Sequence, residues 1–356
     1  AQDASDIRLI ITHWDLLSRA FLYQVAKVAH YANCPKTKVY VVCKGVELVQ
    51  QLIHAAYPHI DECLELHFLE SQDPELTPNV VIQLLASFPD EALTSILFLA
   101  DSPEDSFSGS VRIKDQCKKQ ENLRILLPQS PLSGSLEDRQ LCVLPDSAVF
   151  CNAHMLLQDS IDHLAARVHQ TWYEETRERI KQCLDRGDTP QAERYQNSAY
   201  FQPWTALRNE QKEENRGAAD HLAIKLRALG MAQKDPADMD PAEVDAAAAK
   251  LHAKQLEALA EMEHRRWAAV KWMTGWTLGP RHDPSKRHPN LVSYQELDEP
   301  TKQYDRDQIL ETGNMLRALS ASRKKTTRKM ATSNPMNPGT YRNVTIPFIC
   351  LESLQK

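Results

Sequence analysis

Residues 264–297 read HRRWAAVKWMTGWTLGPRHDPSKRHPNLVSYQEL, and they set the character of the second half of the chain. The stretch holds three tryptophans and three histidines among many cationic side chains. A helix that faces only solvent has no use for so much aromatic surface. Three interpretations are therefore open: a packed corner of the core, a catalytic site, or a pocket for a flat anionic ligand.

An earlier part of the chain repeats this pattern. In both copies a histidine precedes a tryptophan by three residues, as His169 and Trp172 and as His264 and Trp267. Downstream, each copy has an aromatic residue, a leucine, a lysine and an arginine at identical offsets. These positions are Trp204, Leu207, Lys212 and Arg216 in the first copy, and Tyr294, Leu297, Lys302 and Arg306 in the second. We interpret residues 155–230 and 255–318 as the two halves of an internal repeat.

Two such halves are expected to pack about a pseudo-two-fold axis, as the sides of an isologous pair do. Residues three or four apart share one face of a helix, so the histidine and tryptophan of each copy point the same way. The packing would bring both tryptophans and several cations to a common cleft. From about residue 152 the apolar positions recur at helical spacing, which predicts an all-α region over 151–320.

A cleft of this kind fits a purine, which stacks on aromatic rings, while lysine and arginine bind phosphate. The alternative is that the tryptophans are helix-packing core, the interpretation we favour for Trp272 and Trp276. A helix histidine more often bonds a backbone carbonyl than a ligand, and nearby glutamates compete for Lys212 and Arg216. The candidate ligand contacts are Trp172, Trp267, His169, His264, Arg216, Arg266, Lys286, Tyr294, Lys302 and Arg306.

The sequence carries no common catalytic motif. GxSxG, a Walker loop and HExxH are all missing from it. His282 and His288 lie six residues apart beside Asp283, a spacing that does not favour a metal. We expect no catalytic residue, no metal site and no resident cofactor.

Residues 263–306, EHRRWAAVKWMTGWTLGPRHDPSKRHPNLVSYQELDEPTKQYDR, are similar to the RyR domain, named for the repeats of ryanodine receptors. The similarity implies a helical module of paired repeats that binds an adenine nucleotide between its halves, of the ADP, ATP, cyclic nucleotide or ADP-ribose type. The similarity lies in the pattern HxxW, GWxxG, DxxK, HPxL, an aromatic, Leu and Lys, found here at His264, Trp267, Gly275, Trp276, Gly279, Asp283, Lys286, His288, Pro289, Leu291, Tyr294, Leu297 and Lys302. The first copy of the repeat lacks GWxxG and HPxL.

Residues 1–150 alternate short apolar runs with helical patterns. Strands separated by helices predict a parallel sheet covered on both faces, in a Rossmann-like α/β domain. The strands are expected at 7–11, 38–42, 64–69, 95–100, 123–127 and 141–145, and the helices at 15–31, 45–57, 75–88 and 107–120.

The turn after the first strand lacks the glycines that dinucleotide binding requires. His13, Asp15 and Ser18 stand in their places, and Cys43 replaces the acid that would bond a ribose. With QVAKVAHYANCPKTKVYVVCK (24–44) and AAYPHIDECLELHFLE (55–70), this half resembles the nucleotide-binding domain of TrkA-type, or RCK, potassium-transport regulators. We expect a degenerate scaffold or dimerisation domain.

Bulk composition gives few further constraints. The net charge of -6 gives no reason to expect nucleic-acid binding. Eight scattered cysteines without a CxxC pair indicate reduced thiols in the cytoplasm. No apolar run is long enough to cross a bilayer. The chain starts at Ala1, so a pore segment upstream is a further expectation, and the basic segment 321–356 is read as a solvated tail, with a phosphate-binding arm as the alternative.

Together these patterns predict a non-enzymatic cytosolic sensor. It would bind a nucleotide or a nucleotide-derived messenger in the repeat cleft, and we expect a homo-oligomer. The two resemblances imply that it is the soluble part of a channel-like or defence protein. One alternative is a structural oligomerisation module without a small ligand. The other is an NAD-linked enzyme that uses the first domain.

Overall fold

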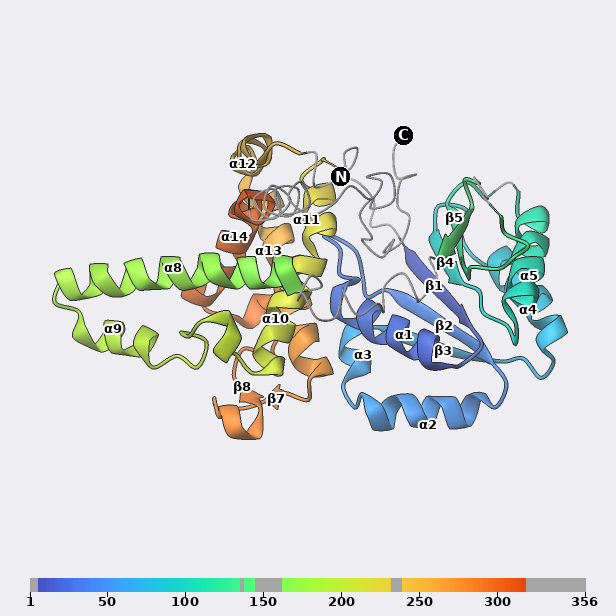
Figure 1. Ribbon diagram of the computed structural model, residues 1–356, viewed down its shortest axis with the longest axis horizontal. Coiled ribbons are helices and arrows are strands. Elements are labelled where there is room, and N and C mark those ends of the chain that lie inside the picture. The colour runs from blue at the N-terminus through green and yellow to red at the C-terminus, as the bar shows by residue number, and fades with distance from the viewer. Residues whose placement is uncertain (1–5, 119, 135–137, 145–161, 232–238, 318–356) are drawn as a thin grey trace, which may run out of the picture.

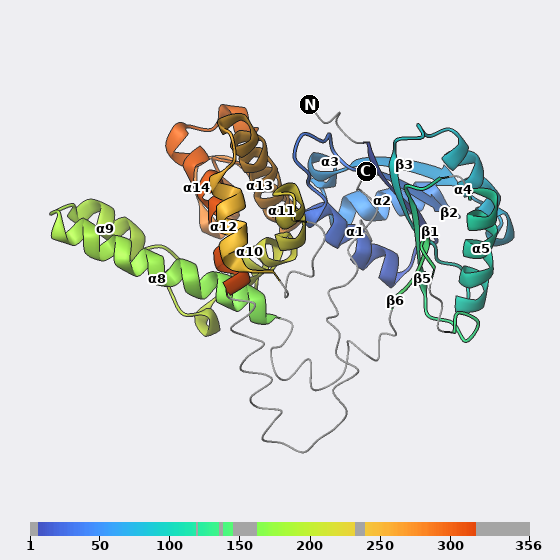
Figure 2. The ribbon, with the colours of Figure 1, turned by 90° about the horizontal axis from the view of Figure 1, so that it is seen from above.

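The computed structural model describes residues 6–118, 120–134, 138–144, 162–231 and 239–317. It contains an α/β region followed in sequence by a helical region, and the two lie side by side in Figures 1 and 2. The expected tail at 321–356 lies outside the described residues.

A six-stranded parallel sheet organises the α/β region. Its strand order is β3-β2-β1-β4-β5-β6, the order of doubly wound dinucleotide-binding folds. Every expected strand is present, with ends shifted by no more than a few residues. The strands are β1 (Ile7–Thr12), β2 (Lys38–Cys43), β3 (Glu65–Glu70), β4 (Leu93–Leu97), β5 (Leu123–Pro128) and β6 (Leu141–Leu144).

Helices cover both faces of this sheet, so its inner strands are buried on both sides, whereas the edge strand β3 is only partly buried. Successive residues of β1 face opposite cores: Leu9 and Ile11 belong to one, Ile10 to the other. The first core is covered by α1, α2 and α3, and the second by α4 and α5. Their bounds are α1 (Leu16–Val28), α2 (Val46–Ala56), α3 (Ile60–Cys63), α4 (Thr77–Ala86, after the 3-10 turn Pro74–Leu76) and α5 (Pro103–Gln116).

Two helices of this region begin against carboxylates of the chain itself. The side chain of Asp15 accepts a hydrogen bond from the Ser18 backbone N–H at the start of α1. At the start of α2, Glu70 accepts from the N–H groups of Gly45 and Val46, both at 2.9 Å. In dinucleotide-binding folds a helix N-terminus holds phosphate. A phosphate at either of these would have to displace a carboxylate.

The helical region repeats one arrangement: a long helix, a 3-10 turn and a shorter helix. In the first copy the long helix α8 pairs with α10, and in the second α13 pairs with α14. In Figure 2 the far end of α8 and α9 project away from the rest. The elements are α8 (His163–Asp185), α9 (Thr189–Gln196), the turn Trp204–Ala206, α10 (Asn209–Asp220), α11 (Leu222–Ala228), α12 (Pro241–Ala249), α13 (Ala253–Met273), β7 (Thr277–Leu278), the turn Asp283–Ser285, β8 (Arg287–His288), the turn Tyr294–Glu296 and α14 (Glu299–Leu310).

Helix α13 joins the two regions. Its residues Ala269 and Met273 belong to the core beneath α1 and α3. Trp272 lies against His59, with ring centroids 4.8 Å apart, as expected for a core tryptophan. The Arg265 guanidinium donates to the carbonyl oxygens of Tyr31 at 2.6 Å and Cys34 at 2.8 Å. One face of α13 is thus fixed to the sheet region.

Candidate ligand-binding site

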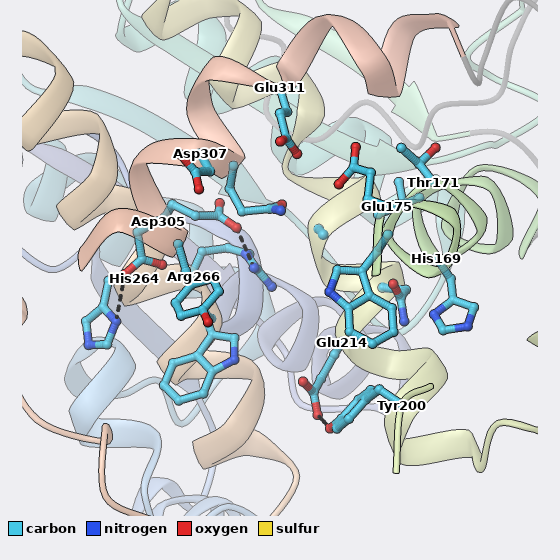
Figure 3. A pocket seen from close by; sticks show the side chains of 18 of the residues that line it. His169, Thr171, Glu175, Tyr200, Glu214, His264, Arg266, Asp305, Asp307 and Glu311 are labelled. Carbon is cyan, nitrogen blue, oxygen red and sulfur yellow. Dashed lines mark hydrogen bonds and ion pairs between the residues drawn. The ribbon is translucent and has the colours of Figure 1, made fainter. Parts of the chain in front are cut away.

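A cavity of about 430 Å³ lies between the two copies of the helical pattern. Helices α8 and α10 form one side, and α13 and α14 form the other. In Figure 3, Thr171, Glu175 and Tyr200 face Arg266, Asp305 and Asp307 across it. The volume is in the range of small-molecule sites in proteins.

The two copies share their internal contacts at matched positions. His169 Nε2 donates to the carbonyl oxygen of Gln202 at 2.8 Å, and His264 Nε2 to that of Val292 at 2.9 Å. Each acceptor lies two residues before the aromatic residue of its copy. Burial lowers the pKa of His169, although its bond to Gln202 opposes the shift. Both histidines therefore anchor a loop, the alternative weighed for them from sequence.

Ring contacts repeat in the same way. The His169 and Trp172 rings stack with centroids 5.8 Å apart, and the His264 and Trp267 rings with centroids 5.6 Å apart. In each copy a lysine also lies over the downstream aromatic ring. These pairs are Lys212 over Trp204 at 5.3 Å and Lys302 over Tyr294 at 5.5 Å.

Two tryptophans, Trp172 of the first copy and Trp267 of the second, line the cavity. They occupy matched positions of the repeat, and both are half-buried. Trp276 is buried, with Lys271 over its ring at 3.9 Å, which agrees with a core role. The repeat therefore places one partly open indole from each copy in a shared space.

The cavity takes in only part of the predicted ligand set. His169, Trp172, His264, Arg266 and Trp267 line it. Five others do not, and each has partners within the chain, so the structure does not bring them to the cavity. They are Arg216, Lys286, Tyr294, Lys302 and Arg306.

The two arginines of this second group form ion pairs that also match between copies. Arg216 binds Asp162 with two bonds of 2.6 Å, and Arg306 binds Glu257 at 2.6 and 3.1 Å. Tyr294 is buried and donates to the same glutamate at 2.9 Å. Each acid lies seven residues before the histidine of its copy, so the sequence already contained this signal.

The loop between α13 and α14 crosses to the first copy. Lys286 Nζ lies 2.7 Å from Glu210 Oε1 of α10, and it donates to the Thr274 carbonyl at 3.1 Å. Gly275, with φ +83°, makes the turn out of α13, as expected from sequence. His288 Nδ1 accepts from the Asn290 backbone N–H at 3.1 Å and so holds the loop, again as expected. This segment closes one end of the cavity.

The charge of the cavity differs from the expected positive lining. Among the described residues that line it, carboxylates outnumber lysines and arginines by six to four. The expectation was wrong because it counted cations of the quoted stretch and not the acids that α8 and α14 bring to the same space. The acids are Glu175, Glu214, Glu263, Asp305, Asp307 and Glu311, and the cations are Arg179, Arg266, Lys271 and Arg281.

A buried charged group lies behind the cavity wall. Glu263 of α13 accepts from Arg266 at 2.5 Å and lies 3.0 Å from Lys225 Nζ of α11. Nearby cations keep the pKa of Glu263 well below its usual value against the opposing effect of burial. His221 Nε2 donates to the His30 carbonyl at 3.0 Å, and its Nδ1 lies 3.6 Å from Glu263. This group connects the cavity to the end of α1.

A second ionic group lies at the lower side of the cavity in Figure 3. Glu214 accepts from Tyr200 and from Lys271 Nζ, the latter at 2.6 Å. Burial first, and Glu214 second, raise the pKa of Tyr200. Sequence reasoning missed these residues because α10, α13 and the α9–α10 link meet only in the folded chain.

Two kinds of feature are absent from the described residues. They contain no group of three or more histidine, cysteine or acidic side chains placed to hold a metal ion. None of the described helices combines the length and the apolar character needed to span a membrane.

Comparison with known families gives one match to the helical region. The family model of the RyR domain matches residues 238–325. This range contains α13, the loop that crosses to the first copy, and α14. The resemblance of residues 1–150 to TrkA-type regulators stays a prediction.

Proposed function

We propose that this protein is a non-enzymatic sensor that binds an adenine nucleotide or a nucleotide-derived messenger in the cavity between its two helical copies. The observation that carries the proposal is the placement of Trp172 and Trp267, from matched positions, in one cavity of about 430 Å³. Stacking on an aromatic side chain is worth about 1–3 kcal/mol per base. We also propose that a pseudo-two-fold axis relates the copies, which the matched contacts support.

Helix α13 would transmit the bound state. His264, Arg266 and Trp267 lie on its cavity side, while Arg265 and Ala269 contact the sheet region. A ligand that fits one position of α13 better than another would change the population of the two. The α/β region would read that change through α1 and α3, which α13 contacts directly.

We place this activity in the cytoplasm. Cys43, Cys63, Cys117 and Cys183 are free thiols. Reduced thiols are the rule in that compartment, whereas secreted proteins use cysteines for disulfides.

Calorimetric titration with ADP, ATP, cyclic AMP and ADP-ribose tests the proposal. We expect at least one of them to bind, and Trp172→Ala and Trp267→Ala each to weaken that binding tenfold or more, as loss of about 1.4 kcal/mol or more of stacking requires. Trp204→Phe is the matched control, because Trp204 packs on His169 outside the cavity lining.

The structural alternative gives a different result. If the indoles serve only packing, both alanine variants lose helical circular dichroism or change the oligomeric state, and no nucleotide gives heat with the wild type. Retained fold with lost binding supports the sensor. No binding of any nucleotide by a folded wild-type protein refutes it.

A further inference from the structure

The carboxylates that line the cavity are not all neutralised. Glu263 is paired with Arg266, and Glu214 with Lys271. Three others, Glu175, Asp307 and Glu311, share only Arg179 among the cations that line the cavity, at 3.8 Å from Glu175. Figure 3 shows Glu311 near the top of the space, between Glu175 from α8 and Asp307 from α14, so the acidic side of the cavity is this upper edge. A ligand therefore meets an acidic side.

Arg266 supplies the opposite chemistry. It is 4% exposed, and one of its N–H groups donates to Glu263. Its Nε and Nη1 atoms are buried and have no hydrogen-bond partner among the described residues. A buried donor without an acceptor costs free energy, which a ligand acceptor can recover.

A small acceptor group, such as a single phosphate, suits Arg266. The guanidinium lies close to α10: a side-chain carbon at Gly217 would sit 3.5 Å from Nη1. Nη2 donates to Glu263 and lies on the same edge of the guanidinium as Nε, whereas Nη1 lies on the other edge, so Nε and Nη1 each offer a separate donor to a phosphate oxygen. One phosphate can be met there, but a longer chain of phosphates would extend toward the acidic side.

We propose, on the basis of the proposed function, that the cavity selects a nucleoside carrying at most one phosphate and excludes nucleoside triphosphates. The phosphate is bound at Arg266. The hydroxyl and amino groups of the nucleoside donate to Glu175, Asp307 and Glu311. Additional phosphates are repelled by those carboxylates, because like charges in a partly enclosed site repel strongly.

The test compares adenosine, AMP, ADP and ATP by calorimetry at one ionic strength without Mg²⁺. We expect AMP to bind at least about tenfold more tightly than ATP, with ADP between them. The double variant Asp307→Asn/Glu311→Gln should reduce the preference for AMP over ATP severalfold, because it removes two repelling charges, and it should weaken adenosine, which donates to the same two groups. Glu299→Gln is the control, since it removes one carboxylate charge from a side chain that is 71% exposed and outside the cavity lining.

Arg266→Gln adds a second, independent measurement. It should remove the advantage of AMP over adenosine while leaving adenosine binding within about twofold, as loss of one charged hydrogen-bond donor predicts. If this variant does not fold, the carboxylate variants still decide the question.

The outcomes separate the two proposals. ATP binding as tight as AMP, or an unchanged ratio of AMP to ATP affinity in the double variant, overturns the selectivity and leaves the sensor intact. No binding of any adenosine compound, including a result in which only the cationic probe spermidine binds, overturns both.

Discussion

His169 and His264 make the same hydrogen bond on two different helices. Each donates from Nε2 to the carbonyl oxygen two residues before the aromatic residue of its copy, at 2.8 and 2.9 Å. Their rings also stack on matched tryptophans at nearly equal distances. The internal repeat seen in the sequence is thus a repeat of contacts.

The first prediction concerns this pair. His169→Ala and His264→Ala should each lower the free energy of unfolding by about 1–3 kcal/mol, because each leaves a loop carbonyl without its donor. Chemical denaturation measures the change. His67→Ala, on an exposed edge strand, should change stability by less than about 0.5 kcal/mol. A large loss in one variant and none in the other would show that the contacts are not equivalent.

The second prediction compares two glutamates of α13. Glu263→Gln should cost about 3–5 kcal/mol, since it leaves Lys225 and Arg266 buried without their counter-charge. Glu257→Gln, whose side chain is 43% exposed beside Arg306, should cost at most about 1 kcal/mol. Urea denaturation of both variants distinguishes the two cases. Equal losses would mean that the buried group contributes no more than a surface ion pair.

The third prediction concerns the contact between the two regions. Arg265→Lys cannot serve both carbonyl oxygens as the planar guanidinium does. We expect faster backbone hydrogen exchange in residues 253–273, equivalent to about 1.5–3 kcal/mol of lost protection. Arg186→Lys, at an exposed helix end, serves as the control. Unchanged exchange in Arg265→Lys would place the coupling elsewhere on α13.

The fourth prediction is a pH dependence. Burial lowers the pKa of His30 to about 3. An unfolded histidine has a pKa near 6.5. Between these values the unfolded chain binds a proton that the folded protein does not, so the free energy of unfolding falls as the pH falls. From pH 7 to 5 this group alone accounts for roughly 2 kcal/mol.

His30→Leu isolates this contribution. The variant should lose less stability than the wild type between pH 7 and 5, as measured by denaturation at several pH values. Between pH 7.5 and 8.5 the difference between the two proteins should stay constant. Parallel pH profiles across the whole range would contradict the shifted pKa.

The strands of the sheet region were predictable because their burial on both faces leaves nearly continuous apolar runs, such as Ile7–Thr12. The short elements were not predictable from the sequence. α3, with residues IDEC, and the two-residue strands β7 and β8 have too few positions to show a period of hydrophobic residues. Their form depends on neighbours distant in sequence.

The site was predictable as far as the repeat reached. Matched offsets found Trp172 and Trp267 and their histidines, because a repeated helix pair repeats its faces. The acidic side of the cavity was not predictable, since Glu175 on α8 and Glu311 just after α14 occupy positions that read equally well as solvent-facing. Glutamates near Arg216 were weighed as competitors, and Glu213 does lie 3.2 Å from it, but Asp162 was overlooked, as was Glu257 beside Arg306.

Because α13 lines the cavity and also packs against the sheet region, it limits where the chain can be truncated and which substitutions it tolerates. A fragment cut at residue 162 would keep every described residue that lines the cavity, yet it would uncover Ala269, Trp272 and Met273 along one strip. Such a bare apolar strip favours self-association and precipitation. Recombinant production of the helical region therefore requires the sheet region in the same chain. Substitutions on the two faces of α13 are expected to be tolerated only in compatible combinations.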